Sequence, residues 1–237
     1  MQIEMILLKP YKQFGNFSKG AIKKEYGSFF LPLYFFIFVY LSLIIFSNQL
    51  IAQNLYVHFK LTNGISFDLP KNWRVIDSNT RTTLDASVAA RHPVKIHSSL
   101  PFAANLYNSN NQTIGIMNIR VYPTMDVTQN EVVNLNSSSL NEFNKQLRSS
   151  ISNGVKLAGG KLTEWYGTEK VNVNGKVYLL SKYKRQSAFN PNLYFKVNLL
   201  RLLDSQNSFT LTLSYEEKVK YFLKPIIDKI RSSIQKR

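Results

Sequence analysis

The segment Phe-Thr-Leu-Thr-Leu-Ser-Tyr at residues 209–215 shows the pattern that decides the fold. Its large apolar side chains at the odd positions alternate with Thr210, Thr212 and Ser214. Because successive side chains of a β-strand point to opposite faces, this alternation gives one apolar face and one polar face. The pattern predicts an antiparallel sheet that packs a core against one face.

Three further strands are predicted before this segment, at residues 161–173, 176–186 and 193–203. Asn174 and Gly175 separate the first two, and Asn-Gly is typical of a tight turn between antiparallel strands. The region 161–215 is therefore predicted to form a four-strand meander.

The chain before the meander alternates strands with helices. A hairpin is predicted from residues 55–61 and 65–69 around Asn63 and Gly64, then a short helix at 79–91 and a strand pair at 102–107 and 113–122. Thr128 and Glu131 have the spacing of a capping box and predict a helix start. The helix is expected to run to about Ser152 with one apolar face of Val133, Leu140, Phe143, Leu147 and Ile151.

A second amphipathic helix is predicted at the C-terminus, with Val219, Phe222, Ile226, Ile230 and Ile234 on its apolar face. Pro225 cannot donate an amide hydrogen bond, so we expect either a kink there or a main helix that begins at this residue. The fold class is therefore α+β, an antiparallel sheet covered by helices.

Three features together resemble the PsbP-like superfamily. They are the opening GISFDLPKNW of residues 64–73, the long helix before a Gly-rich turn and meander, and the ending 226–234 with Ser232 and Ser233. Within that superfamily the chain is most similar to small bacterial envelope proteins of the DcrB type. The resemblance implies an α/β/α sandwich at residues 54–237 and a non-catalytic binding or assembly role, with partners that differ between members.

The N-terminal region predicts a membrane segment. No charged side chain occurs between Ser28 and Val57, and residues 29–46 are almost wholly apolar, about 27 Å of helix at 1.5 Å per residue. Five lysines within residues 1–28 predict a cytoplasmic tail, so residues 54–237 are expected outside the cytoplasm, as a periplasmic, secreted or membrane-anchored domain. Residues 29–53 fit a transmembrane anchor and a signal peptide cleaved after Ala52 equally well.

The domain at residues 54–237 is basic. Of the chain's 30 Lys and Arg and 14 Asp and Glu, five lysines and two glutamates lie in the first 53 residues, which leaves a net charge of about +13. We expect an anionic envelope component or an acidic protein as partner, whereas the alternative is a basic surface that serves solubility only. A nucleic-acid partner is disfavoured because the domain is expected outside the cytoplasm. The absence of cysteine excludes a disulfide framework.

No catalytic or metal-binding pattern occurs in the sequence. The three histidines, His58, His92 and His97, match no strong zinc motif, and we expect no metal and no cofactor. The protein is therefore predicted not to be an enzyme, although the sequence leaves open a carboxylate pair that only the fold brings together.

The candidate binding surface lies on the meander. Lys176, Tyr178, Lys182 and Lys184 share one face of a predicted strand, and Lys196 lies on the next strand. If no helix covers this face, it forms a cationic stripe for an anionic partner; the alternative is solvated lysines that protect a sheet edge. A second hypothesis is a carrier that encloses an apolar or lipid ligand between helices and sheet.

Overall fold

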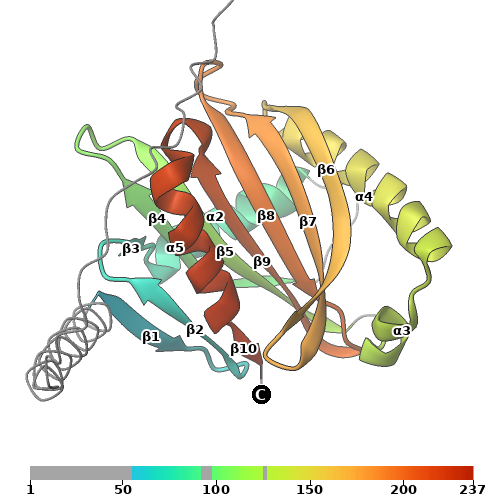
Figure 1. The fold of residues 1–237 in the computed structure, drawn as a ribbon. Coiled ribbons are helices and arrows are strands. Elements are labelled where there is room, and N and C mark those ends of the chain that lie inside the picture. The colour runs from blue at the N-terminus through green and yellow to red at the C-terminus, as the bar shows by residue number, and fades with distance from the viewer. Residues whose placement is uncertain (1–54, 92–97, 125–126, 237) are drawn as a thin grey trace, which may run out of the picture. The chain divides into compact units, whose positions relative to one another are not determined.

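The computed structural model describes residues 55–91, 98–124 and 127–236 (Figure 1). The predicted tail at 1–28 and the predicted membrane segment at 29–53 lie outside these ranges, and so does residue 54. Among the described helices, none is long and apolar enough to cross a membrane. The membrane segment therefore stays a prediction.

The domain contains a seven-stranded antiparallel sheet in the order β3-β4-β5-β9-β8-β7-β6. The last four strands of this order, β9, β8, β7 and β6, form the predicted meander. The strands are β3 (Arg74–Val75), β4 (Ser99–Tyr107), β5 (Thr113–Thr124), β6 (Lys161–Val173), β7 (Lys176–Gln186), β8 (Tyr194–Leu202) and β9 (Gln206–Glu216). Asn174 and Gly175 both have positive φ angles, 50° and 82°, as the tight turn between β6 and β7 requires.

A second, three-stranded sheet covers part of one face of the large sheet. Its order is β1 (Tyr56–Lys60), β2 (Ile65–Pro70), β10 (Gln235–Lys236), so the C-terminal residues pair with the first hairpin. Helix α5 (Lys220–Ser233) follows a 3₁₀ turn, η1 (Glu217–Val219), and lies in the same layer (Figure 1). No pattern in residues 235 and 236 indicates that they pair with β2.

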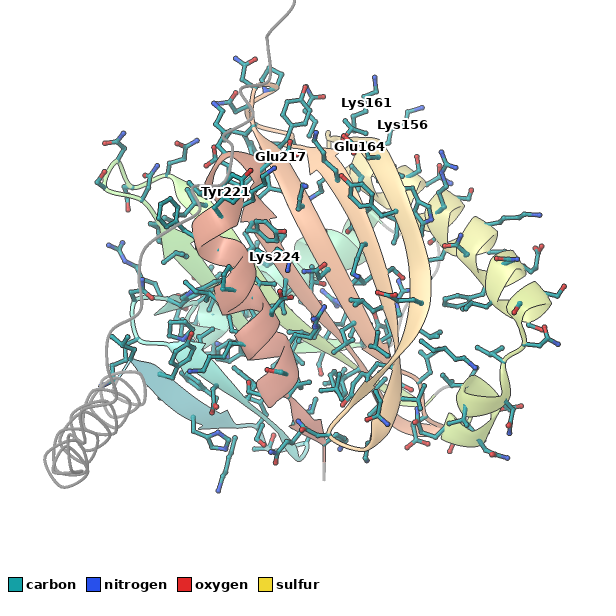
Figure 2. The ribbon with its side chains drawn as sticks, in the orientation of Figure 1. Lys156, Lys161, Glu164, Glu217, Tyr221 and Lys224 are labelled. Carbon is teal, nitrogen blue, oxygen red and sulfur yellow. The ribbon has the colours of Figure 1, made fainter. Side chains whose placement is uncertain are left out.

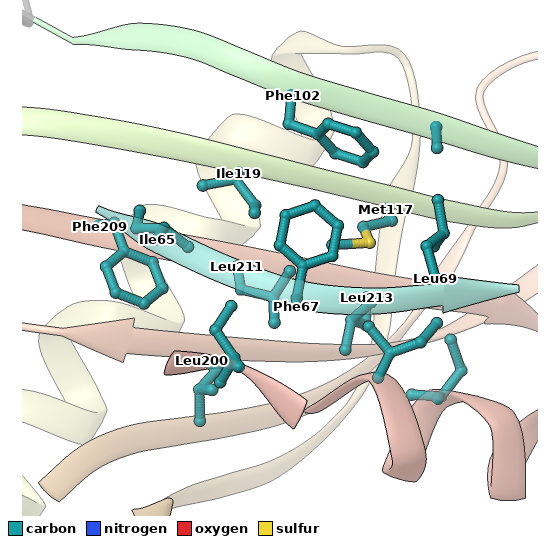
Figure 3. Close-up of a cluster of buried hydrophobic side chains, with 14 of the residues drawn as sticks. Ile65, Phe67, Leu69, Phe102, Met117, Ile119, Leu200, Phe209, Leu211 and Leu213 are labelled. Carbon is teal, nitrogen blue, oxygen red and sulfur yellow. The ribbon is translucent and has the colours of Figure 1, made fainter. Parts of the chain in front are cut away.

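The main core fills the space between this layer and the large sheet (Figure 3). Ile65, Phe67 and Leu69 of β2 point at the odd-numbered side chains of β5 and β9, and Phe67 packs edge-on against Phe102 with ring centroids 4.8 Å apart. Helix α5 adds Leu223, Ile227 and Ile230, all at most 4% exposed. The alternation in residues 209–215 thus predicted the core-facing side chains correctly.

Three helices lie on the opposite face of the large sheet. Helix α2 (Ser78–Arg91) is joined to β5 by an ion pair between Asp85 and Arg120, with 2.5 Å between Oδ1 and Nη1. Helices α3 (Gln129–Asn134) and α4 (Ser137–Leu157) cover β7 and β6 through two small apolar clusters. The architecture is α+β with antiparallel sheets, as predicted.

The prediction of one long helix from Thr128 to about Ser152 is wrong in one respect. This region forms two helices, α3 and α4. Its capping box is confirmed, but α3 ends at Asn134 and a new helix starts with Asn136, whose side chain accepts a hydrogen bond of 2.8 Å from the Ser139 amide. An asparagine that caps a new helix competes with continuation of the old one. In α3 the buried side chain is Val132, while the predicted Val133 is 46% exposed.

The apolar face predicted for the C-terminal helix also needs correction. Phe222 is 79% exposed, and its neighbour Leu223 packs into the core instead. The helix begins at Lys220 and not at Pro225, which lies inside it. Ile230 and Ile234 lie in the core, as predicted. The error in the predicted apolar face therefore concerns only the first turns of the helix.

Candidate functional site

The predicted lysine face of β7 divides into two halves with different surroundings. In the first half, Tyr178 and Leu180 are each only 1% exposed and belong to the main core, and the Tyr178 ring packs edge-on against Phe209. Burial raises the pKa of Tyr178 to about 12. The prediction of Tyr178 as a surface residue is therefore wrong, because β2, β10 and α5 cover this half of the face.

Lys176 lies at the far end of β7, apart from the other predicted lysines. It lines a shallow pocket together with Lys236 of β10. Burial, and then the charge of Lys176, lowers the pKa of Lys236. The structure therefore does not join Lys176 to the remaining site.

The second half of the β7 face holds a network of ion pairs. Lys184 Nζ lies 2.9 Å from Glu164 of β6 and 2.8 Å from Glu217 of η1, and its side chain is only 16% exposed. The hydrogen bonds to Glu217 and then to Glu164 raise the pKa of Lys184. Lys184 thus connects the edge strand β6 to the start of the C-terminal helix.

The other two predicted lysines also have carboxylate neighbours. Lys182 Nζ lies 2.6 Å from Glu169 of β6, and Lys196 Nζ lies 3.6 Å from Glu217. Because each lysine is paired, this half of the face is not the uninterrupted cationic stripe that sequence analysis expected.

Lys182 and Lys196 nevertheless meet in a cleft of about 290 Å³ between α5 and the uncovered part of the sheet. Figure 1 shows α5 in front of the large sheet with β8, β7 and β6 beside it. The residues that line the cleft come from five elements: Tyr166, Lys182, Tyr183, Lys196, Val197, Asn198, Tyr215, Lys224, Asp228 and Arg231. Four of them are cations and one is a carboxylate.

Helix α5 contributes the charged wall of the cleft. Asp228 accepts from Lys224 one turn before it, at 2.7 Å, and lies 3.1 Å from Arg231 one turn after it. The hydrogen bond to Asp228 raises the pKa of Lys224. A single carboxylate therefore orients two cations. Figure 2 labels Lys224 at the upper part of the helix.

A bulge in β6 brings an aromatic residue to the cleft. The pairing of β6 with β7 shifts between Trp165 and Gly167, and Gly167 has a φ of +105° that an L side chain rarely adopts. The extra residue is Tyr166, whose hydroxyl donates to Glu164 at 2.6 Å and whose ring lies 5.9 Å from Lys196 Nζ. Burial and the hydrogen bond to Glu164 raise the pKa of Tyr166 to about 12.

Sequence analysis missed the half of the site that α5 supplies. Lys224, Asp228 and Arg231 are spaced four and three residues apart, which places them on one helix face and was a usable signal. Nothing in the sequence indicated that this face meets Lys182 and Lys196, which are about 30 to 50 positions away. Tyr183 is buried in the small apolar cluster under α4.

The described residues offer little for metal chemistry. No group of three or more His, Asp and Glu side chains in the described ranges is arranged to hold a metal ion. His58 lies on β1, where its Nδ1 is 2.7 Å from Asp68 Oδ1, and His92 and His97 fall outside the described ranges. The cleft presents four cations, tyrosine hydroxyls, one amide and one carboxylate, and this excess of cations is suited to holding an anion by charge-assisted hydrogen bonds.

No protein-family model matches the chain, and no curated protein matches its sequence. Among solved structures, the chain is similar to cyanobacterial PsbP (CyanoP) from Synechocystis sp. PCC 6803, with a TM-score of 0.48 and 14% identity over 77% of this chain and 92% of that one. It is also similar to a crystal structure from Bacteroides thetaiotaomicron, with a TM-score of 0.37 and 12% identity over 73% of this chain and 45% of that one. The similarity to PsbP concerns the fold alone, and the DcrB-type group stays a prediction.

Proposed function

We propose that the domain is a non-catalytic binding module that holds an anionic group of an extracytoplasmic partner in the cleft beside α5. The observation that carries the proposal is the lining of this cleft, where the four cations Lys182, Lys196, Lys224 and Arg231 outnumber the single carboxylate, Asp228. Tyr215 and Asn198 add polar groups to the same lining. A carboxylate or phosphate that enters the cleft meets an excess of positive charge.

The carboxylates outside the cleft keep its lysines in place. Glu169 and Glu217 hold Lys182 and Lys196 from the sides of β6 and η1, so the ammonium groups lose less side-chain entropy when they bind an anion. The domain's net charge of about +13 attracts an anionic partner over a longer range. The predicted membrane segment supplies the extracytoplasmic location.

The alternative of an apolar-ligand carrier has weaker support. The space between α5 and the large sheet is filled by core side chains such as Leu223, Ile227 and Leu211, which are at most 4% exposed. A lipid ligand there requires that this packed layer opens.

Isothermal titration calorimetry of the full chain in detergent tests the proposal, with inorganic pyrophosphate and citrate as separate probes. We expect at least one of them to bind with an affinity that falls as salt rises. The double variant Lys196→Gln with Arg231→Gln removes two cations of the cleft, and we expect binding to weaken by about tenfold or more, because charge-assisted hydrogen bonds contribute about 1.5–3 kcal/mol each.

The matched control is Lys60→Gln with Lys145→Gln, which removes the same charge at exposed positions of β1 and α4. We expect it to bind like the unmodified chain. If neither probe binds the unmodified chain, or if the two double variants weaken binding equally, the cleft is not the anion site.

A further inference from the structure

Four large apolar side chains project into solvent from one end of the large sheet. Phe189, in the loop between β7 and β8, is 99% exposed, and Tyr221 and Phe222, at the start of α5, are 80% and 79% exposed. Leu157, at the end of α4, is 56% exposed. Single exposed apolar residues are ordinary, but several gathered at one end indicate an interaction surface.

Three connections bring these residues to the same end. The first residue of β6, Lys161, pairs with Gln186 at the end of β7, and a Cβ on Gly159 would lie 3.4 Å from that of Ala188. The α4–β6 turn therefore adjoins the β7–β8 loop. The ion pair between Lys184 and Glu217 brings η1 and the start of α5 to this end as well.

Figures 1 and 2 show the elements that carry these residues. In Figure 1 the β7–β8 loop and the start of α5 lie together at the upper end of the sheet. Figure 2 labels Lys156, Lys161, Glu217 and Tyr221 at that end. We call this region, with Leu157, Phe189, Tyr221 and Phe222 as its apolar tips, the loop end.

Lysines that have no carboxylate partner among the described residues surround the apolar tips. No carboxylate of the described residues lies within ion-pair distance of Lys156, Lys161, Lys218 or Lys220. Of the nearby acids, Glu164 and Glu217 are both held by Lys184, and Glu216 is buried, only 6% exposed. The loop end is therefore apolar at its tips and positive around them.

We infer that the loop end docks on an anionic lipid surface. Aromatic side chains are stable at the depth of lipid headgroups, where the ring leaves water, and lysines beside them attract anionic headgroups. The tips come from one loop and two helix ends, so they can enter the headgroup layer without opening the core. Charge complementarity favours a membrane surface over a second copy of this basic domain.

The docking surface is separate from the cleft. Lys182, Lys196 and Arg231 line the cleft, and none of them belongs to the loop end. The inference therefore does not depend on the proposed function, and the variants of the two regions change different side chains.

The test measures whether Phe189 enters a bilayer. The variant Phe189→Trp of the full chain is reconstituted in phosphatidylglycerol–phosphatidylcholine vesicles whose acyl chains carry bromine, a quencher of tryptophan fluorescence. The control variant is Val133→Trp, an exposed position on α3, which Gln129 joins to the opposite end of β7 by a hydrogen bond to Val177 O. The native Trp73 and Trp165 contribute equally to both variants.

We expect quenching of Phe189→Trp on vesicles that contain phosphatidylglycerol, little on phosphatidylcholine alone, and none beyond background for Val133→Trp. Adding Lys218→Gln and Lys220→Gln to Phe189→Trp should weaken docking by roughly 25-fold, because a lysine near an anionic surface contributes about fivefold. Lys60→Gln with Lys145→Gln, far from the loop end, should not.

Two results would overturn the inference. One is equal quenching of Phe189→Trp and Val133→Trp on anionic vesicles, which means that the loop end does not enter the bilayer and that its apolar tips serve a protein partner or none. The other is quenching of Phe189→Trp that is insensitive to phosphatidylglycerol and to the two loop-end lysines, which removes the anionic lipid as the partner.

Discussion

The two halves of the lysine face of β7 have similar sequence patterns and opposite roles. Tyr178 and Leu180 lie in the main core, whereas Lys182 and Lys184, the next two residues on the same face, lie in an ion-pair network beside an open cleft. The difference arises because β2, β10 and α5 cover only the first half. Which face a residue occupies follows from the strand period, but whether that face is core depends on where the covering layer ends.

The largest difference in the free energy of unfolding is expected when one side chain in each half is truncated to alanine. Leu180→Ala leaves a cavity in the core and should lower the free energy of unfolding by about 2–5 kcal/mol. Lys182→Ala, two residues along the same face, should change it by less than about 1 kcal/mol, since exposed ion pairs contribute little. Urea unfolding of the full chain measures both; equal losses would contradict the division into halves.

High pH should destabilise the covered half through Tyr178. Its pKa is about 12 in the folded protein against 10.0 for an unburied tyrosine, so its contribution to stability is present below pH 10 and is lost as the pH rises toward 12. The loss should be about 2–3 kcal/mol, at 1.36 kcal/mol per pKa unit. In Tyr178→Phe this part of the alkaline decline should disappear, which unfolding curves at pH 10 and 12 measure. Identical declines in the two proteins would count against the buried hydroxyl.

A smaller loss of stability should follow from a substitution in the β6 bulge beside the open half. Gly167→Ala places a Cβ at a φ of +105° and should lower the free energy of unfolding by about 1–2 kcal/mol. Its control is Gly154→Ala in α4, where an added Cβ meets no atom within 4 Å and should stabilise the helix by about 0.5–1 kcal/mol. Opposite signs in thermal unfolding support the account, and stabilisation by both would show that the bulge carries no strain.

The smallest difference concerns Lys184 and Lys176. Lys184→Ala removes a cation shared by Glu164 and Glu217 and should cost about 1 kcal/mol, the upper range for exposed pairs. Lys176→Ala, which has no carboxylate partner within the described ranges, should change the free energy of unfolding by less than about 0.5 kcal/mol. A larger loss for Lys176→Ala would reverse the roles assigned to the two ends of the strand.

The strands could be predicted from the sequence, because the alternation of apolar and polar residues and the turn residues between strands are local signals. Phe209 to Tyr215 was predicted with the correct core face, and Asn174 and Gly175 with the correct turn. The burial of Tyr178 was not predictable in the same way, since it depends on the hairpin and α5, which are distant in the sequence. An isolated Asn136 capping residue was likewise too weak a local signal to divide the predicted long helix.

The candidate site was half predictable for the same reason. Lys182 and Lys196 were found because they lie on adjacent strands of a meander whose register follows from its turns. Lys224, Asp228 and Arg231 were missed because their helix packs against the sheet at a position that no local pattern fixes. The bulge that presents Tyr166 was also unforeseen, although a glycine inside a predicted strand, Gly167, often marks one.

The most direct test of the division is an NMR titration of the full chain, in detergent and with assigned backbone amides, with inorganic pyrophosphate. We predict chemical-shift changes concentrated at Lys182, Lys196, Asn198 and Arg231 and absent at Tyr178, Leu180 and Lys176. Changes centred on Lys176 and Lys236, or no localised changes at concentrations that bind, would contradict the claim that the uncovered half of the sheet face is the binding site.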